Sequence, residues 1–163
     1  MFKGFKMSNL KGCYMSNTDN WRTPSRMFSA FMRAGFVDCF SYMSKEDEFK
    51  KDYYGKKLYI NPPYSQISRG GVLNWVIKQA KQDNTIWLLI PARTDTKKFR
   101  DLIDQCGEHL QLIFITGRLK FNDSKNSAPF PSVFVVISPD IKQGQQFSIM
   151  TEEELLNDLE NYL

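Results

Sequence analysis

The stretch Lys57-Leu-Tyr-Ile-Asn-Pro-Pro-Tyr64 decides the fold, because an apolar strand in it runs directly into a stiff polar corner. Leucine, tyrosine and isoleucine in succession are typical of a strand. The two prolines that follow have a fixed φ and no backbone N–H, so they cannot continue the hydrogen bonding of a sheet. The sequence therefore predicts a short buried strand over residues 57–60 that ends in a rigid turn.

Strands and helices alternate on both sides of this stretch. Apolar runs predict further strands over residues 36–38, 85–90, 110–115 and 133–137. Helical spacing of apolar residues predicts helices over residues 24–35, 72–80 and 151–163. A further helix has its apolar face at Phe99, Leu102 and Cys106, with Thr94, Asp95 and Thr96 as candidate caps and Gly107 as its end. We expect Thr23 to cap the first helix, with Pro24 at its first position. The alternation predicts an α/β domain with a mostly parallel central sheet and flanking helices.

Polar residues follow several of the predicted strands. Asp38, Asn61, Arg93 and Arg118 each lie at or just beyond a strand end. In open α/β sheets, ligands bind beyond the carboxyl ends of the strands. We therefore expect these side chains to share one rim of the sheet, where a ligand site would form.

The corner after the central strand has a definite chemical capacity. The Asn61 side chain offers one acceptor oxygen and two N–H donors. Its oxygen and a proline carbonyl can together accept both hydrogens of an exocyclic amino group, which frees the nitrogen lone pair for attack. Tyr64 can stack on a flat heterocycle, an interaction of roughly 1–3 kcal/mol per base. The structural alternative is a Pro-Pro turn with a capping asparagine and a buried tyrosine.

Composition limits the class of protein. The chain has 163 residues, 42% of them hydrophobic and 14% aromatic, which is typical of one folded domain. No apolar run approaches the roughly 20 residues of a membrane helix, and the first residues lack the apolar segment of a signal peptide. Three widely spaced cysteines and one histidine suggest neither a disulfide framework nor a metal site. We expect a cytoplasmic protein without membrane or metal partners.

Charge is divided unevenly along the chain. Residues 1–137 carry 21 Lys and Arg against 12 Asp and Glu, whereas residues 138–163 carry 1 against 6. A basic body suits a polyanion partner, because Lys and Arg neutralise phosphates. Ordinary solvated charge is the alternative interpretation of this modest excess.

Six motifs in a fixed order resemble one family. They are Asp19-Asn-Trp-Arg-Thr-Pro24, Phe36-Val-Asp38, Asn61-Pro-Pro-Tyr-Ser65, Pro91-Ala-Arg-Thr-Asp-Thr96, Gly117-Arg-Leu-Lys-Phe121 and Ala128-Pro-Phe-Pro-Ser132. Their order resembles the phage-type, Dam-like DNA adenine-N6 methyltransferases over about residues 17–137. The resemblance implies a single Rossmann-like methyltransferase domain that uses S-adenosylmethionine. It also implies methyl transfer to the N6 amino group of a flipped adenine in double-stranded DNA, in phage or restriction–modification biology.

The resemblance also implies a cofactor site. Thr23, followed by Pro24, would contact the amino-acid end of S-adenosylmethionine, and Asp38 would bind its ammonium group or its ribose. Asn61 would lie beside the cofactor. Either Glu46 or Asp47 would supply a further contact.

The implied catalytic and substrate residues lie around the same corner. The catalytic motif comprises Asn61, Pro62, Pro63 and Tyr64, which would hold the flipped adenine. The implied substrate contacts are Tyr64, Ser65, Arg93, Asp95, Arg118 and Lys120. The segments around Arg93 and Lys120 have plain alternatives, a solvated helix start and a simple turn between strands.

The motifs also suggest boundaries and alternatives. Residues 1–20 would form an N-terminal arm, residues 21–138 the methyltransferase-like domain, and residues 139–163 an acidic C-terminal extension with a helix. The oligomeric state is open, a homodimer included. A second hypothesis is a nucleic-acid-binding or protein-interaction module with impaired cofactor binding, suggested by the short stretch after Asp38 and by the acidic end. Methylation of RNA or of a protein glutamine is a third.

Overall fold

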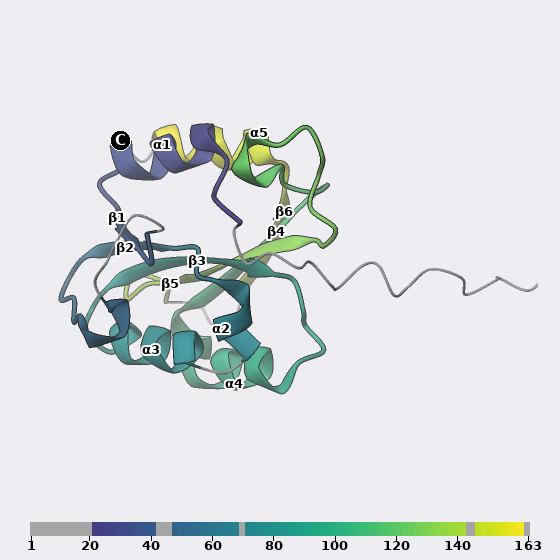
Figure 1. Cartoon of the computed structure of the whole chain (residues 1–163). Coiled ribbons are helices and arrows are strands. Elements are labelled where there is room, and N and C mark those ends of the chain that lie inside the picture. Colours follow the sequence, from purple (N-terminus) through teal and green to yellow (C-terminus); the bar gives the residue numbers. More distant parts are fainter. Residues whose placement is uncertain (1–20, 42–46, 69–70, 143–145, 162–163) are drawn as a thin grey trace, which may run out of the picture.

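The computed structural model describes residues 21–41, 47–68, 71–142 and 146–161, which form a three-layer α/β structure (Figure 1). The strands are β1 (Val37–Cys39), β2 (Lys57–Ile60), β3 (Thr85–Pro91), β4 (Leu110–Ile115), β5 (Ser132–Ile137) and β6 (Gln146–Met150). The longer helices are α1 (Ser25–Arg33), α3 (Gly71–Ala80), α4 (Lys97–Cys106) and α5 (Glu152–Asn161). Short helical turns are η2 (Glu48–Lys50), α2 (Tyr64–Ser68), η3 (Gly107–His109) and η4 (Phe121–Asp123).

The six strands form one mixed sheet in the order β1-β2-β3-β5-β4-β6. The pairs β1–β2, β2–β3 and β4–β6 are parallel, whereas β5 runs antiparallel to both of its neighbours. The predicted α/β class is confirmed, with β5 as the exception to its parallel pattern. The carboxyl ends of the other strands and the start of β5 therefore share one rim.

Helices cover both faces of the central strands of the sheet. Helices α1 and α5 cover one face, and α2, α3 and α4 cover the other (Figure 1). Along β5, Val133, Val135 and Ile137 face the α3 and α4 layer, while Phe134 and Val136 face α1 and α5. A strand buried on both faces favours apolar side chains, which explains the unbroken apolar run over residues 133–137.

Most predicted elements are present, but the first helix begins differently. Pro24 occupies the N-cap position of α1, and its side chain makes no capping hydrogen bond. The prediction that Thr23 caps the helix is wrong, because its hydroxyl group bonds to the sheet instead. Strand β6 and the short helix α2 were not predicted. The N-terminal arm and Glu46 lie outside the described residues.

The acidic end of the chain packs on the body. Thr151 and Glu154 form the predicted capping box at the start of α5: the Thr151 backbone N–H donates to Glu154 Oε2 (2.7 Å), and the Glu154 N–H donates to Thr151 Oγ1 (3.2 Å). Leu155 and Leu159 are fully buried in the same cluster as α1. The ion pairs Arg26–Glu153 and Arg33–Glu160 join the exposed sides of α1 and α5.

We predict that α5 contributes to the stability of the whole domain. Leu155→Ala should lower the free energy of unfolding by about 2–5 kcal/mol, because it leaves a cavity beneath α5. The exposed Asn157→Ala on the same helix should change it by less than about 0.5 kcal/mol. Chemical denaturation checks both values, and a wild-type midpoint for Leu155→Ala would contradict the assignment of α5 to the core.

Candidate active site

A cavity of about 710 Å³ opens at the rim of the sheet where β1 and β2 end. Four segments line it: the approach and first turns of α1, the end of β1, the corner after β2, and η4. The register of the parallel pair, with Cys39 opposite Ile60, places the residues after both strands side by side. The lining residues include Trp21, Arg22, Thr23, Ser25, Asp38, Phe40, Asn61, Pro62, Pro63, Asn122 and Asp123.

The Asn61 side chain has a fixed orientation at the edge of this cavity. Its amide nitrogen Nδ2 donates to the Trp21 carbonyl (2.6 Å) and to Thr23 Oγ1 (3.0 Å). Both N–H groups are therefore used. The amide oxygen Oδ1 is buried and has no hydrogen-bond partner among the residues that the structure describes. A buried polar atom without a partner carries a free-energy cost, so this oxygen is suited to accept a hydrogen bond from a ligand.

The two prolines of the corner have different roles. The Pro63 carbonyl accepts the backbone N–H of Gln66 (3.0 Å), which begins α2. Both prolines line the cavity. The bond from Gln66 engages the carbonyl of Pro63 and not that of Pro62. Pro62 is buried, and Asn61, Pro63 and Tyr64 are half-buried.

Thr23 connects Asn61 to the core. Its hydroxyl lies 2.6 Å from the Tyr59 hydroxyl on β2 and accepts the bond from Asn61 Nδ2. Tyr59 is 1% exposed and packs against Phe31 of α1, with ring centroids 4.3 Å apart. Burial is the main reason why the pKa of Tyr59 lies above its usual value, so the phenol stays neutral. The corner is thus tied to a rigid aromatic core.

Asp38 supplies a carboxyl group to the same cavity. Burial is the largest influence on it and raises its pKa to about 6; a hydrogen bond from Ser41 acts in the opposite direction, and the nearby Glu48 carboxylate adds to the rise. A carboxylate held in such surroundings is stabilised by a ligand cation.

Phe40 makes the sharp turn after β1. Its φ of 65° lies in the left-handed region, which bulky residues rarely adopt. Edge-to-face contacts hold the ring, with centroids 5.2 Å from Phe49 and 5.3 Å from Trp75. Aromatic packing thus supports a turn that a glycine commonly makes.

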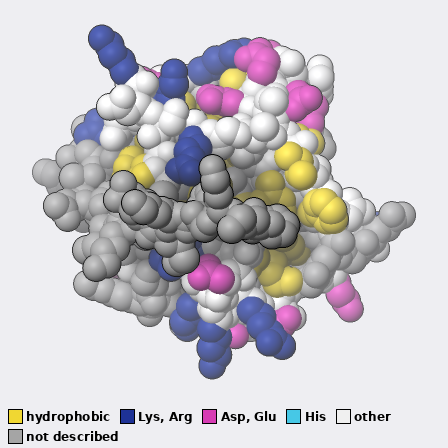
Figure 2. All heavy atoms as spheres, turned by 90° about the vertical axis from the view of Figure 1, so that its right-hand side faces the viewer, with side chains coloured by type: hydrophobic (Ala, Val, Ile, Leu, Met, Phe, Trp, Pro, Cys, Tyr) yellow, Lys and Arg dark blue, Asp and Glu magenta, His cyan; other side chains and the backbone are white. Residues whose placement is uncertain are grey.

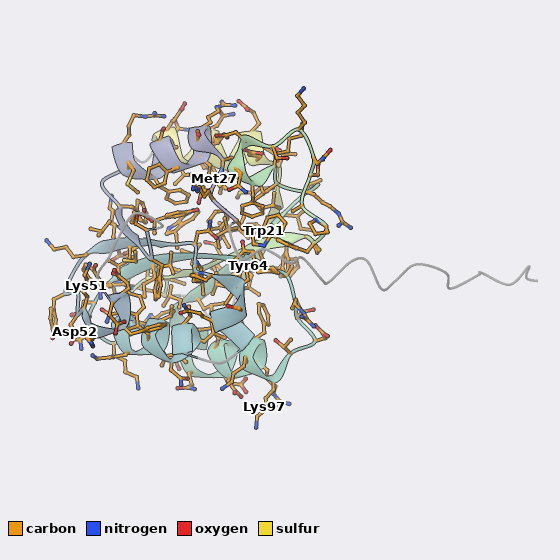
Figure 3. The ribbon with its side chains drawn as sticks, viewed as in Figure 1. Trp21, Met27, Lys51, Asp52, Tyr64 and Lys97 are labelled. Atoms are coloured by element: carbon orange, nitrogen blue, oxygen red, sulfur yellow. The ribbon has the colours of Figure 1, made fainter. Side chains whose placement is uncertain are left out.

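Tyr64 belongs to an aromatic group beside the cavity. Its ring lies edge-to-face with Phe130 (5.5 Å between centroids) and Phe121 (6.3 Å), and Trp21 contacts the same two rings. Figure 3 shows Trp21 and Tyr64 close together at this rim, far from Lys51 and Asp52. Tyr64 does not line the cavity itself.

The structure brings five of the predicted site residues to the cavity: Thr23, Asp38, Asn61, Pro62 and Pro63. Asp47 instead caps η2, accepting from the Phe49 N–H (3.2 Å), and pairs with Lys50. The other predicted residues, which lie outside the cavity lining, are Pro24, Tyr64, Ser65, Arg93, Asp95, Arg118 and Lys120. Of these, Ser65, Arg93, Asp95, Arg118 and Lys120 are exposed.

Four contributors to the site were missed from the sequence: the Trp21 carbonyl, Tyr59, Asn122 and Asp123. A backbone carbonyl is present at every residue, so the sequence does not single out that of Trp21. A tyrosine within an apolar strand, such as Tyr59, is predicted to be a core residue. The stretch around Lys120 is polar, but nothing in its sequence shows that its next residues turn back to the start of α1.

A model of one protein family matches the chain over residues 11–161, and its description is DNA N-6-adenine-methyltransferase (Dam). The chain belongs to the Dam family. No curated protein and no solved structure matches it. The Dam match extends beyond the predicted 17–137 and includes β6 and α5.

Dam-family membership indicates an enzyme that methylates adenine in DNA. Within the described part of this Dam-family chain, no helix has the length and apolar character to cross a bilayer. The same residues contain no group of three His, Cys, Asp or Glu side chains that could hold a metal ion.

The fixed amide predicts that Asn61→Asp is harmful in a pH-dependent way. The carboxylate would face the Trp21 carbonyl, an acceptor, so the folded state would favour the protonated acid and raise its pKa. The variant should thus lose most stability at high pH and regain part of it as the pH falls towards 4, where the acid can donate. Thermal unfolding between pH 4 and 8 measures this.

The exposed Asn74→Asp on α3 is the matched control, since it adds the same charge in water. An Asn61→Asp protein as stable as this control at pH 8 would show that the two donated hydrogen bonds do not fix the side chain.

Proposed function

We propose that this chain transfers a methyl group from S-adenosylmethionine to the N6 amino group of an adenine flipped out of double-stranded DNA. The observation that carries the proposal is the buried, unpartnered Asn61 Oδ1 beside a cavity of about 710 Å³. An acceptor without a partner matches an amino group, which brings hydrogens to donate. Family membership supports the choice of adenine in DNA.

The residues at the cavity fit the cofactor. Its volume lies within the roughly 300–1,000 Å³ of small-molecule sites. The Asp38 carboxylate could bind the ammonium group or the ribose of S-adenosylmethionine. The Thr23 hydroxyl could bind the carboxylate of the cofactor's amino-acid end. Bound there, S-adenosylmethionine would supply an electrophilic methyl group: the adenine nitrogen would take it as the methyl–sulfur bond breaks, leaving the thioether product, and one N6 proton would pass to solvent.

Asn61 and Pro62 would prepare the amino group. Oδ1 would accept one N6 hydrogen and the Pro62 carbonyl the other, which turns the nitrogen lone pair away from the ring. Because Trp21 and Thr23 hold Nδ2, the acceptor needs no rearrangement when the base arrives, and such preorganised dipoles lower the barrier. Tyr64 and Ser65, at the start of α2, would contact the base beyond the corner.

DNA would approach the rim where the loops after β3 and β4 lie. This rim is on the right of Figure 1 and faces the viewer in Figure 2, where basic and acidic side chains are both spread over the surface. Arg93, Arg118 and Lys120 are exposed in these loops and would contact phosphates, with Asp95 nearby in the sequence. Flipping a base costs a few kcal/mol, which such contacts offset.

The main test of the proposal is transfer itself. The wild-type protein, incubated with adenine-containing duplex DNA and labelled S-adenosylmethionine, should yield N6-methyladenine on nucleoside analysis. Asn61→Ala should abolish the product and leave cofactor affinity within a few-fold. The exposed Asn126→Ala is the control and should retain activity. A folded wild-type protein that binds DNA and cofactor but forms no product would instead be a binding module.

Cofactor binding should depend on pH through Asp38. Because burial raises the pKa of Asp38 to about 6 and the bound cation needs the carboxylate, affinity should be full at pH 8 and about tenfold weaker at pH 5. Asp38→Asn should weaken binding and remove this dependence, whereas the exposed Asp140→Asn should keep it. Calorimetric titration measures the affinities. A flat pH profile for the wild type would count against the role of Asp38.

A further inference from the structure

Residues 21–25 supply both acceptors of the Asn61 amide, and the turn η4 holds this segment at two points. On one side of Thr23, the Arg22 N–H donates to Asn122 Oδ1 (2.9 Å) and the Asn122 N–H donates to the Arg22 carbonyl (2.8 Å). On the other side, the Ser25 N–H donates to Asp123 Oδ1 (2.9 Å), and the Ser25 hydroxyl donates to Asp123 Oδ2. Four hydrogen bonds therefore bracket Thr23.

Asp123 caps α1 from a distant part of the chain. Pro24 offers no side-chain cap, so the Ser25 N–H at the helix start is satisfied by this carboxylate. The hydrogen bonds from Ser25 hold the pKa of Asp123 below its usual range. The bond from the Ser25 side chain has the larger effect and the bond from its backbone the smaller. The negative charge also suits the positive end of the helix dipole.

The turn adopts an unusual backbone to make these contacts. Asn122 and Asp123 have φ values of 59° and 51°, two successive non-glycine residues in the left-handed region. Such residues persist when their surroundings stabilise them, and Asn and Asp tolerate the region best. Here both side chains accept hydrogen bonds from residues 21–25, and the left-handed backbone is what directs them to that segment.

We propose that Asn122 and Asp123 are positioning residues of the methyl transfer: they fix residues 21–25 and through them the orientation of the Asn61 amide. The inference rests on the proposed function. Both carboxylate oxygens of Asp123 bond to Ser25, and Asn122 Oδ1 bonds to Arg22, so these oxygens act on the protein itself. Releasing the segment would loosen the Trp21 carbonyl and Thr23, and the acceptor Oδ1 would lose its direction.

Asp123→Gly tests the inference, because glycine keeps the left-handed backbone while removing both bonds to Ser25. We expect kcat to fall about tenfold or more, since small displacements of a reacting group are costly. The KM for DNA should stay within about twofold, and the affinity for S-adenosylmethionine should fall by a smaller factor than kcat, because Thr23 supplies one of several proposed cofactor contacts. Asp123→Asn retains an acceptor and should restore most of kcat.

Asp83→Gly is the matched control. Asp83 is also an exposed aspartate in the left-handed region (φ 56°), but it precedes β3 at the other end of the sheet. Its kcat should equal that of the wild type. If Asp123→Gly does not fold, Ser25→Ala replaces it and should also lower kcat; where both fold, the double variant should be no worse than Asp123→Gly alone, because the two residues form one contact.

A second readout is independent of activity. The Asn61 side-chain NH₂ resonances, assigned by their loss in Asn61→Ala, should exchange with solvent faster in Asp123→Gly than in the wild type. Wild-type kcat together with unchanged Asn61 exchange would overturn the inference. A rise in KM or cofactor Kd without a change in kcat would also overturn it, because it would indicate direct ligand contact. An inactive wild type with faster exchange in the variant would reject the proposed function but not the positioning.

Discussion

Two hydrogen bonds donated by the Asn61 amide group fix which of its atoms is left to meet a ligand. Asn61 Nδ2 donates to the Trp21 carbonyl and to Thr23 Oγ1, so the side chain presents only its oxygen in the direction left open. A carbonyl cannot donate, and this removes the ambiguity between the two ends of the amide. An oxygen held in that orientation favours a ligand that brings a hydrogen-bond donor, and the cavity beside it has the volume of a small-molecule site.

Several elements of the fold support this orientation of the Asn61 amide. The parallel register of β1 and β2 brings Asp38 and Asn61 to one rim. Tyr59, buried against Phe31, fixes Thr23 from the core. The η4 turn fixes the same segment from the surface. Helix α5 packs beside α1 on the same face of the sheet. The site is therefore built from residues distant in sequence, each held by an element with its own structural support.

The sequence was most informative where periodicity and chemistry agreed. Strands β2 and β4 were predicted at their observed bounds, and the capping box at Thr151 formed as expected. Residues next to strand ends, such as Asp38 and Asn61, could be assigned to one rim because topology alone places them there. Strand β6 was not predicted, since its exposed Phe147 and Ile149 give no clear buried pattern.

Tertiary contacts account for the remaining differences. Thr23 looks like a helix cap in sequence, but its hydroxyl finds Tyr59 and Asn61, and Asp123 caps the helix in its place. The ring of Tyr64 packs edge-to-face on Phe121 and Phe130, two contacts that its place in the sequence does not predict. Long-range pairings of this kind depend on where the chain returns in space, which local spacing does not encode.

The orientation of Asn61 towards its substrate can be seen in a crystal structure of the protein with S-adenosylmethionine and adenosine. We expect the adenine N6 within hydrogen-bond distance of Asn61 Oδ1 and the Pro62 carbonyl, with Nδ2 still on Trp21 and Thr23. An amide rotated so that its nitrogen faces the base, or ligands bound away from the rim beyond β1 and β2, would contradict it.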